Sequence, residues 1–479
     1  MSVRKIFFVS LVSVTVGIHL EMISLLPRSI PVGPALPWTE PALLLAAEMV
    51  NRTYAPHITM SVKLIYNMTH KTCEDADADN PGLLGEYYYS QDDTDARHSH
   101  SGTCWAVIGS MCGGFLEAAN LAREWNIVAF SNGLLRDDAF SNEHQPTAVS
   151  LGGNIDSYAM VLMKILDQNG WRHVSLLTDA NTGNGAGFYG LLSNALMRMA
   201  MASSTMHAFE STNFDGKDMQ SVLPLLARAK SRSRVIFLLT LTGRALNVLD
   251  IARNENMTSS EYVYFIVQPL EQEQYGRVSL FSNSPQNMNS TYARVTYVTT
   301  HKTDDLVANL NYQLATRTDA DPKTGKPLYD NESQGLSLYR FSTKQPLENF
   351  SVRATYDSIE LFAKIVNETV QVSRSINFCN GSLLVKMMSN RNFDLQTGET
   401  FIKMDSTRNL DLDIYGYDQI DGIMRPLMWY DSVDGMLKNY SSFRKDNEGR
   451  FTSPLIFPPP DEPECGYSGL SGPCAEEKR

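Results

Sequence analysis

The sequence predicts an α/β protein in which two sheets of parallel strands follow one another along the chain. Apolar, strand-like runs alternate with helical patterns up to Ser131, and the alternation starts again at Ile155. Such alternation typically builds parallel strands with helices on both faces. The chain has 479 residues and is 43% hydrophobic, which is a globular composition but too long for one hydrophobic core. We therefore expect two lobes.

The first half opens with a strand at Leu20–Ser29 and a helix at Pro37–Val50, whose first turn contains prolines that helices tolerate there. The segment Cys73–Gly102 is acidic, polar and rich in tyrosine, so we expect a long surface loop. The other elements of this half are predicted as strands at 58–66, 105–109 and 127–131 and a helix at 113–125.

The second half repeats the pattern with a helix at Ile155–Gly170, a strand at Val174–Thr178 and a Met-rich helix that ends at Met201. Its methionine run, Met197–Met206, is interpreted as core filler. The remaining elements of the second sheet are predicted as helices at 217–231 and 242–254 and strands at 235–241 and 262–267.

The last third of the chain is less regular. The stretch Leu270–Asn349 is polar and poorly patterned, whereas Val352–Val372 predicts a long helix and Cys379–Ser389 a second one. Gly398 lies between two alternating runs, which is a hairpin pattern. The end, SPLIFPPPDEPECGYSGLSGPC, is dense in proline. Because proline fixes φ and favours extended structure, we expect a stiff stalk there.

The N-terminus resembles a secretory signal peptide, expected to cover residues 1–18. Arg4 and Lys5 precede the apolar run Ile6–Ile18, which is shorter than the roughly 20 residues that a membrane span needs. A buried first strand is the alternative. No later window resembles a membrane span, so the mature chain as written is expected to be extracellular. Nine N-x-S/T sequons agree with export and are candidate glycosylation sites: Asn51, Asn67, Asn256, Asn289, Asn331, Asn349, Asn367, Asn380 and Asn439.

Charge and cysteine usage exclude several classes of protein. The net charge of −12 argues against nucleic-acid binding, because an acidic chain repels phosphate backbones. Six cysteines fit an oxidising compartment, and their spacing contains no CxxC zinc pattern. His98 and His100 are interpreted as solvated loop residues, so no metal site is expected.

One stretch suggests an enzyme of another class. Gly185, Gly187 and Gly190 spell G-x-G-x-x-G after a strand, and Glu210 lies about where a ribose-binding acid occurs in NAD-type oxidoreductases. However, the segment Asp179–Asn184 separates the strand from the first glycine, whereas a pyrophosphate needs that glycine directly after the strand. We interpret the glycines as a flexible loop and keep the secreted NAD-type enzyme as the alternative.

Ligands of open α/β sheets bind outside the carboxyl ends of the strands. If the two sheets face each other, the loops at these ends line one cleft. We find no sequence pattern for a catalytic residue, because the nucleophile elbow, the HExxH helix and the P-loop are all absent. The candidate cleft residues at the strand ends are Ser110, Ser131, Asn132, Thr178, Asp179, Thr240 and Thr242.

Five stretches, taken in order, resemble the extracellular region of receptor guanylyl cyclases, the natriuretic peptide receptor or ANF receptor family, in its nematode branch. They are residues 25–51, the G-x-x-C turn with its helix and strand at 107–133, the helix at 354–370, the hairpin at 390–418 and the two-cysteine stalk at 458–474. The resemblance implies a type I periplasmic-binding-protein fold with two Rossmann-like lobes and a cleft between them.

The family's chain order implies these boundaries: signal peptide 1–18, first lobe 19–151, second lobe 152–268, return to the first lobe 269–372, return to the second lobe 373–453 and stalk 454–479. The resemblance also implies the disulfides Cys73–Cys112 and Cys465–Cys474. Cys104 and Cys379 are left over, and a bond between them is one option. Natriuretic receptors hold chloride at the G-x-x-C turn, but Gly109–Cys112 lacks the family's proline, so we expect no cofactor.

The implied function is to sense an extracellular ligand, a peptide or a small molecule, by rearrangement of lobes or of a homodimer. The helix at 113–125 is expected near the dimer contact, and an amphipathic helix packed within one lobe is the alternative. The family continues into transmembrane, kinase-homology and cyclase domains, whereas the given chain stops at Arg479. We therefore expect ligand binding without cyclic GMP synthesis, with a secreted decoy as the alternative.

Overall fold

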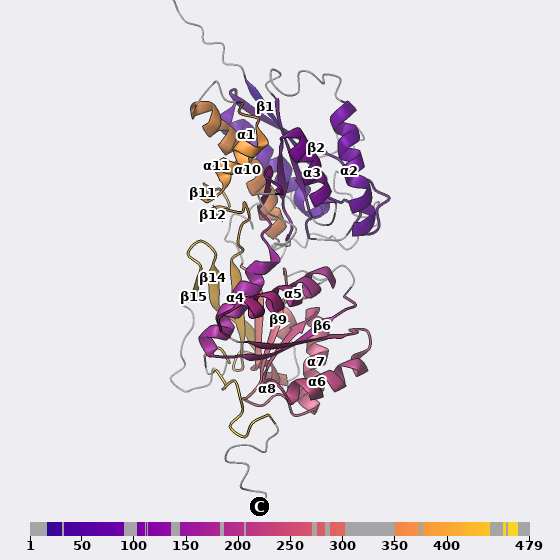
Figure 1. Cartoon of the computed structure of the whole chain (residues 1–479), viewed down its shortest axis with the longest axis vertical. Helices are drawn as coiled ribbons and strands as arrows, with labels where there is room; N and C mark the ends of the chain where they lie inside the picture. Colours follow the sequence, from indigo (N-terminus) through magenta and orange to yellow (C-terminus); the bar gives the residue numbers. More distant parts are fainter. Residues whose placement is uncertain are drawn as a thin grey trace, which may run out of the picture.

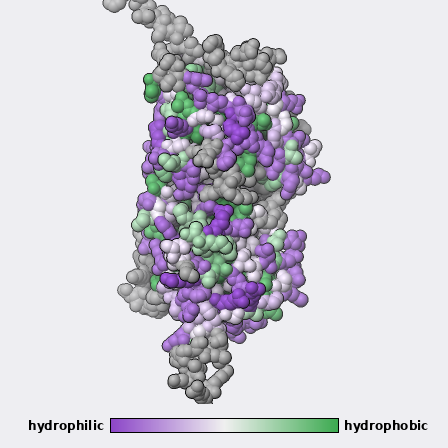
Figure 2. Space-filling model, in the orientation of Figure 1, coloured by the Kyte–Doolittle hydropathy of each residue, from purple (hydrophilic) through white to green (hydrophobic). Residues whose placement is uncertain are grey.

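The computed structural model describes two lobes stacked along the long axis of the molecule, each built on its own sheet (Figure 1). On the face shown in Figure 2, hydrophobic residues lie in small groups among hydrophilic ones. The described residues are 17–30, 33–90, 103–110, 112, 114–135, 144–182, 186–205, 207–270, 275–282, 288–301, 350–372, 377–440, 454–456 and 458–467.

The first lobe has a five-stranded parallel sheet in the order β2-β1-β3-β4-β5. Alternate side chains of its strands face opposite layers, because successive residues of a strand point to opposite sides. Leu20 and Met22 of β1 pack with α1, α10 and α11, whereas Ile23 packs with α2 and α3. The bounds are β1 Ile18–Ser24, α1 Leu36–Tyr54, β2 Ile58–Leu64, α2 Cys73–Ser90, β3 Thr103–Gly109, α3 Phe115–Trp125, β4 Val128–Ser131, β5 Ala148–Ser150, α10 Phe350–Val372 and α11 Gly381–Met388.

The second lobe has an eight-stranded sheet in the order β15-β14-β13-β10-β9-β8-β6-β7. Strands β6 to β10 run parallel, and β13 to β15 continue the sheet antiparallel. Helices α4 and α5 cover one face, and α6 and α7 cover the other. The bounds are α4 Ile155–Asn169, β6 His173–Asp179, α5 Ala186–Ala202, β7 Ala208–Phe214, α6 Val222–Lys230, β8 Val235–Leu239, α7 Thr242–Asn254, β9 Val263–Val267, α8 Asn289–Tyr292, β10 Val295–Thr300, β13 Leu412–Asp418, β14 Ile423–Asp431 and β15 Met436–Asn439.

The two predicted sheets are present, but the chain enters and leaves the lobes at positions that differ from the expected boundaries. Strand β10 belongs to the second sheet, although 269–372 was expected in the first lobe. Helix α11 and the hairpin β11–β12, Arg391–Leu395 and Gly398–Ile402, pack in the first-lobe core, although 373–453 was expected in the second. The physical reason is that β10 is buried along its whole length and α11 and the hairpin bury apolar side chains against α10.

Other local predictions need correction. The expected loop after Cys73 contains the 18-residue helix α2. Its buried residues recur every four positions, at Ala76, Asn80, Leu84 and Tyr88, so the buried stripe is only one residue wide per turn. Most of the other residues are polar, and the sequence therefore shows no clear helical pattern. Strands β5, β7 and β10 also lie where no strand was predicted. The hairpin around Gly398 is confirmed, with φ at +115° at this glycine.

The two described segments that cross between the lobes run side by side. Ser150 accepts a backbone hydrogen bond from Arg408 at 2.9 Å and donates one to Ser406 at 2.9 Å. A Cβ on Gly153, where φ is +80°, would lie 2.5 Å from Leu410. Residues 150–154 and 403–411 therefore run together as a connection between the lobes, called the hinge below.

Three sequence predictions concern the ends of the chain. Most of the expected signal peptide lies outside the described residues, and its last residue, Ile18, begins β1. The expected stalk is not detached in its described part, because residues 458–467 lie against the second lobe at its far end (Figure 1). In the part of the chain that the structure describes, no helix has the length and hydrophobicity of a membrane span.

Candidate functional site

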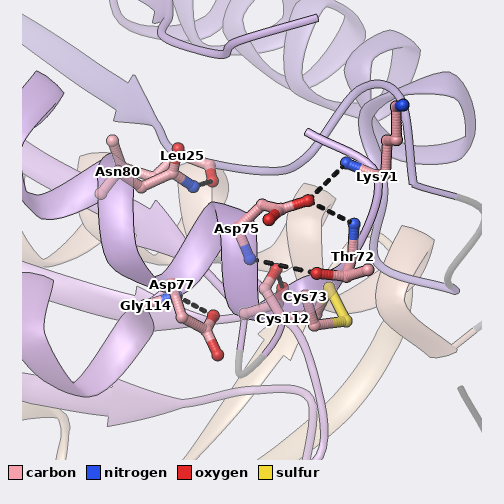
Figure 3. Close-up of a disulfide and its surroundings, with 10 residues drawn as sticks. Leu25, Lys71, Thr72, Cys73, Asp75, Asp77, Asn80, Cys112 and Gly114 are labelled. Atoms are coloured by element: carbon pink, nitrogen blue, oxygen red, sulfur yellow. Dashed lines mark hydrogen bonds between the residues drawn. A yellow bond between two sulfur atoms is a disulfide. The ribbon is translucent and has the colours of Figure 1, made fainter. Parts of the chain in front are cut away.

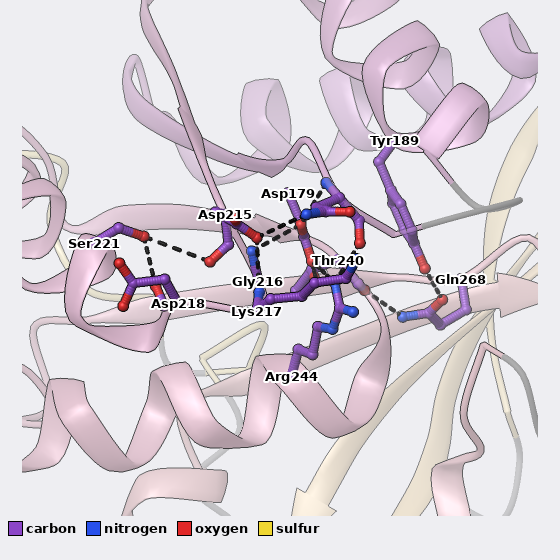
Figure 4. A network of polar contacts seen from close by, with 11 residues as sticks. Asp179, Tyr189, Asp215, Gly216, Lys217, Asp218, Ser221, Thr240, Arg244 and Gln268 are labelled. Atoms are coloured by element: carbon purple, nitrogen blue, oxygen red, sulfur yellow. Dashed lines mark hydrogen bonds and ion pairs between the residues drawn. The ribbon is translucent and has the colours of Figure 1, made fainter.

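The carboxyl edge of the second sheet carries a buried carboxylate network (Figure 4). Asp179 ends β6, and its Oδ2 accepts hydrogen bonds of 2.7 Å from both Thr240 Oγ1 and Arg244 Nη1. Its Oδ1 accepts from the backbone N–H groups of Asn181 at 2.8 Å and Gly216 at 3.0 Å. Four donors thus converge on one side chain whose exposed fraction is 1%.

The electrostatics of this network favour the charged form of Asp179. Burial by itself raises the pKa of the carboxyl, but the hydrogen bonds from Thr240, Arg244 and the two backbone N–H groups outweigh it and lower the pKa. A Cβ at residue 216 would lie 2.0 Å from Asp179 Oδ2, so only glycine fits beside the carboxylate. The network is therefore fixed by local backbone geometry as well as by charge.

Arg244 is the partly exposed member of this network. The side chain is 23% exposed, whereas that of Asp179 is fully buried. Arg244 Nη1 also donates to the carbonyl oxygen of Asn181 at 2.9 Å, which fixes the guanidinium at the sheet edge. Sequence reasoning missed Arg244, because a single arginine on the polar face of α7 looks like any solvated helix residue.

The network continues deeper through an uncharged pair. Gln268 donates from Nε2 to the carbonyl oxygen of Thr240 at 2.8 Å, and its Oε1 accepts from the hydroxyl of Tyr189 at 2.5 Å. Tyr189 belongs to α5 and Gln268 follows β9, so this chain of bonds links both faces of the sheet to the edge. No local sequence signal marks either residue.

The carboxyl edge of the first sheet lies against the hinge. Ser131 O accepts from the N–H groups of Leu151 at 2.9 Å and Gly152 at 3.0 Å. Asn132 donates from Nδ2 to Thr355 Oγ1 of α10 at 2.8 Å. A Cβ at residue 152 would come within 2.4 Å of the Asn132 backbone, so glycine is required there. The edge, α10 and the hinge are therefore packed as one unit.

The seven predicted cleft residues are brought together within each lobe, but all of them are buried. Ser110 donates from Oγ to Cys112 O at 2.7 Å, and Ser131 donates from Oγ to Gly133 O at 3.2 Å. Among the described atoms, the hydroxyls of Thr178 and Thr242 have no hydrogen-bond partner. These seven side chains therefore belong to the packed interior at the two sheet edges and not to an exposed surface. Their contact with a ligand stays a prediction.

The disulfide implied by the resemblance, Cys73–Cys112, is present and joins the start of α2 to the turn before α3 (Figure 3). The next turn of α2 also contacts that turn, because Asp77 Oδ1 accepts a 2.6 Å hydrogen bond from the N–H of Gly114. Gly114 has φ at +69° and precedes α3. The carboxylate of Asp77 therefore already binds one backbone N–H near the turn where the resemblance suggested chloride.

The remaining cysteines are also engaged. Cys104 of β3 forms a disulfide with Cys379, 275 residues away. This pairing is the one option that was named for these two cysteines from the sequence. Cys465 is in a disulfide, and its predicted partner Cys474 lies outside the described residues. A cavity of about 200 Å³ adjoins Cys379 and is lined by Tyr88, Thr103, Trp105, Trp125, Asn126, Ile127, Asn377 and Cys379. It opens at the amino end of the first sheet, away from the two carboxyl edges.

The glycine loop does not form a nucleotide fingerprint in its described part. Gly187 and Gly190 lie inside the first turns of α5, and a Cβ on either would meet nothing within 4 Å. Gly185 lies outside the described residues. The preceding strand ends in the buried carboxylate of Asp179, whose lowered pKa keeps negative charge where a pyrophosphate would bind. Within the described residues, no cluster of three or more His, Cys, Asp or Glu could hold a metal ion.

Two α/β lobes, a connection between them in which two described segments run together, and polar groups gathered at both carboxyl edges define a ligand-binding module of the periplasmic-binding-protein type. The model of the ANF receptor family, described as the receptor family ligand binding region, matches residues 39–420, well over half of the chain. The protein belongs to this family. The family and the two disulfides point to an extracellular location and to an extracellular ligand.

Proposed function

We propose that this chain is the extracellular ligand-binding region of a receptor guanylyl cyclase, and that it reports a ligand by moving its lobes. The observation that carries the proposal is the hinge, in which Ser150 pairs with residues 406–408 and the two segments run together between two separate hydrophobic cores. The five ordered resemblances along the sequence support the guanylyl cyclase branch of the family. The signal-peptide pattern at residues 1–18 and the nine sequons support export.

A ligand changes the arrangement of the lobes only if it binds one arrangement more tightly than the other. A ligand that contacts both carboxyl edges stabilises the arrangement that brings them together, and the population shifts by no more than that difference in affinity allows. Arg244 offers a partly exposed cation at the second edge, held in place by Asp179. We therefore expect the ligand to place a carboxylate, phosphate or carbonyl group against Arg244.

The motion reaches the C-terminal segment because that segment is fixed to the second lobe. Trp171 donates from its indole nitrogen to Pro459 O at 2.8 Å, and Arg172 donates from its backbone N–H to Asp461 Oδ1 at 2.8 Å. Residues 458–467 therefore follow the second lobe as one body. In the proposed receptor this segment leads toward the membrane.

A homodimer is part of the proposal, and α3 contributes its polar face. The apolar side of α3 is turned into its own lobe, where Phe115, Ala118, Ala119, Ala122 and Trp125 are buried. Glu117 and Glu124 lie on the exposed side. The contact between protomers therefore depends on polar residues of this helix.

The proposal is tested by secreting the chain and screening extracellular peptides and metabolites for thermal stabilisation. Hydrogen exchange is then followed with the best ligand bound. We expect protection at the Asp179–Asn181 turn, at Ser131–Asn132 and at the hinge, together with weaker binding by Arg244→Lys. A matched control is Arg253→Lys, which changes an arginine at the far end of the same helix. A ligand that protects neither edge would refute this site, and an unresponsive chimera with a cyclase module would refute the guanylyl cyclase assignment.

A further inference from the structure

The sequon at Asn51 is built into the first lobe by an unusual pair of hydrogen bonds. Asn51 lies near the end of α1, and its Nδ2 donates to Met60 O at 2.9 Å. Its Oδ1 accepts from Met60 N at 2.7 Å. Both polar atoms of the side-chain amide are therefore bonded to the backbone of one residue in β2, an arrangement called the Asn51 clasp below.

The clasp has a clear structural role at the edge of a sheet. Strand β2 is the edge strand of the first sheet and pairs with β1 on one side only. Ile65 donates its N–H to Ser24 O, so the backbone groups of Ile65 point toward β1. Successive residues of a strand direct their N–H and C=O groups to alternate sides. Met60 lies five residues before Ile65, so its N–H and C=O point away from β1. The amide of Asn51 takes the place of a missing neighbouring strand and satisfies both groups.

The clasp uses the hydrogen that an N-linked sugar would replace. The Oδ1 and Nδ2 atoms of Asn51 both bond to the backbone of Met60. Of the two hydrogens on Nδ2, the one that bonds to Met60 O is therefore the one on the same side of the amide as Oδ1. A substituted amide strongly prefers the trans form, which puts the substituent on that same side, cis to the carbonyl oxygen. A sugar on Nδ2 therefore stands where Met60 O is now bound, and the clasp and the glycan exclude each other.

Two other sequons have an exposed asparagine whose side-chain amide is not engaged in a described contact, and they are called open sequons below. Asn256 and Asn439 are exposed, and neither side-chain amide makes a hydrogen bond among the described residues. Asn256 has φ at +57° in the turn after α7, and Asn439 ends β15. A sugar on either nitrogen displaces no described contact.

We infer that the folded protein carries no glycan at Asn51 and carries its glycans at open sequons, Asn256 and Asn439 among them. The inference rests on the extracellular location that the proposed function includes. Attachment at Asn51 would remove two edge hydrogen bonds, so chains modified there fail to reach the native fold and are retained in the cell. The sequon at Asn51 thus encodes a structural contact and not a modification site.

Site-specific mass spectrometry of the secreted full-length protein tests this inference. Enzymatic release of N-glycans in ¹⁸O water labels each asparagine that carried a sugar. We expect label at Asn256 and Asn439 and none at Asn51. Label at Asn51 in folded, secreted protein overturns the inference alone. Label at none of the nine sequons overturns it together with the extracellular location.

A pair of variants separates the clasp from the sequon. Thr53→Ala abolishes the sequon but leaves the amide of Asn51 in place, whereas Asn51→Ala removes both. We expect Asn51→Ala to lower the midpoint of thermal unfolding by about 2–4 °C, and Thr53→Ala to leave both the midpoint and secretion unchanged. Asn256→Ala is the control for losing an open sequon. Equal loss of secretion in Asn51→Ala and Thr53→Ala would show that a glycan supports folding, which overturns the inference.

Discussion

His173 and Asp461 form the contact that holds the C-terminal segment to the second lobe. His173 Nδ1 lies 2.7 Å from Asp461 Oδ2, and the backbone N–H of His173 donates to Asp461 Oδ1 at 3.0 Å. The two residues are 288 positions apart, and the aromatic ring of Tyr467 contacts the imidazole edge-to-face at 5.7 Å. The carboxylate of Asp461 therefore bonds to the start of β6 and fixes the proline-rich segment, which was expected to form a stiff stalk, to the second lobe.

Asp461→Asn is expected to release this segment. The substitution weakens the hydrogen bonds of the carboxylate to His173 and to two backbone N–H groups, and bonds to a charged group contribute about 1.5–3 kcal/mol each when intact. Faster amide exchange at Arg172 and His173, with little change in global unfolding, is the expected result. Glu462→Gln removes the adjacent exposed acid and serves as the control. Unchanged exchange in Asp461→Asn would contradict the anchoring role.

Asp179→Asn is expected to destabilise the second lobe by about 1.5–3 kcal/mol, because the hydrogen bonds from Thr240 and Arg244 and from two backbone N–H groups lose their charged acceptor. Chemical denaturation followed by circular dichroism measures the loss. Asp250→Asn changes an exposed carboxylate of α7 and is expected to stay within about 0.5 kcal/mol of the native protein. A similar loss in both variants would argue against a special role for Asp179.

The same network predicts the direction of the acid response. The folded pKa of Asp179 is lowered, because the hydrogen bonds it accepts outweigh its burial, and its unfolded value is near 3.8. A carboxyl of this kind stabilises the fold above pH 3.8, and the contribution disappears as the pH falls through the lower folded pKa. Unfolding free energies measured between pH 6 and pH 3 should therefore fall less steeply in Asp179→Asn than in the native protein.

Two glycine substitutions should have opposite signs. Gly152→Ala places a Cβ within 2.4 Å of the Asn132 backbone in the hinge, so we expect a loss of about 1–3 kcal/mol. Gly187→Ala fills open space near the start of α5 and is expected to stabilise by up to about 1 kcal/mol. Thermal unfolding distinguishes the two. Destabilisation by Gly187→Ala would contradict the open space around this glycine.

Chloride is expected to have no specific effect on the native protein. Asp77 already supplies an anionic oxygen to the N–H of Gly114 at the turn before α3. Sodium chloride and sodium gluconate at equal ionic strength should therefore give the same unfolding midpoint. Asp77→Ala exposes the amide, and stabilisation of this variant by chloride alone would show that the carboxylate replaces the ion. Specific stabilisation of the native protein by chloride would contradict this prediction.

The sequence by itself determined the two sheets, because local periodicity records which side chains a strand or helix buries. The runs around Val107, Leu176 and Phe237 predicted their strands from a few neighbouring residues. The hairpin at Gly398 followed in the same way, since one glycine in the left-handed region joins two alternating strands. The Cys73–Cys112 pairing came from the resemblance to the family and not from spacing.

Only the tertiary structure decided how the sheets exchange segments and which polar groups meet. Strand β10 gave no signal because three of its six residues are threonine, so the run looks polar although all six are buried. Helix α2 gave little signal because its apolar stripe is one residue wide per turn. Arg244 meets Asp179 across 65 residues, and Cys104 meets Cys379 across 275. Such contacts depend on the path of the chain between lobes, which local hydrophobic patterns do not encode.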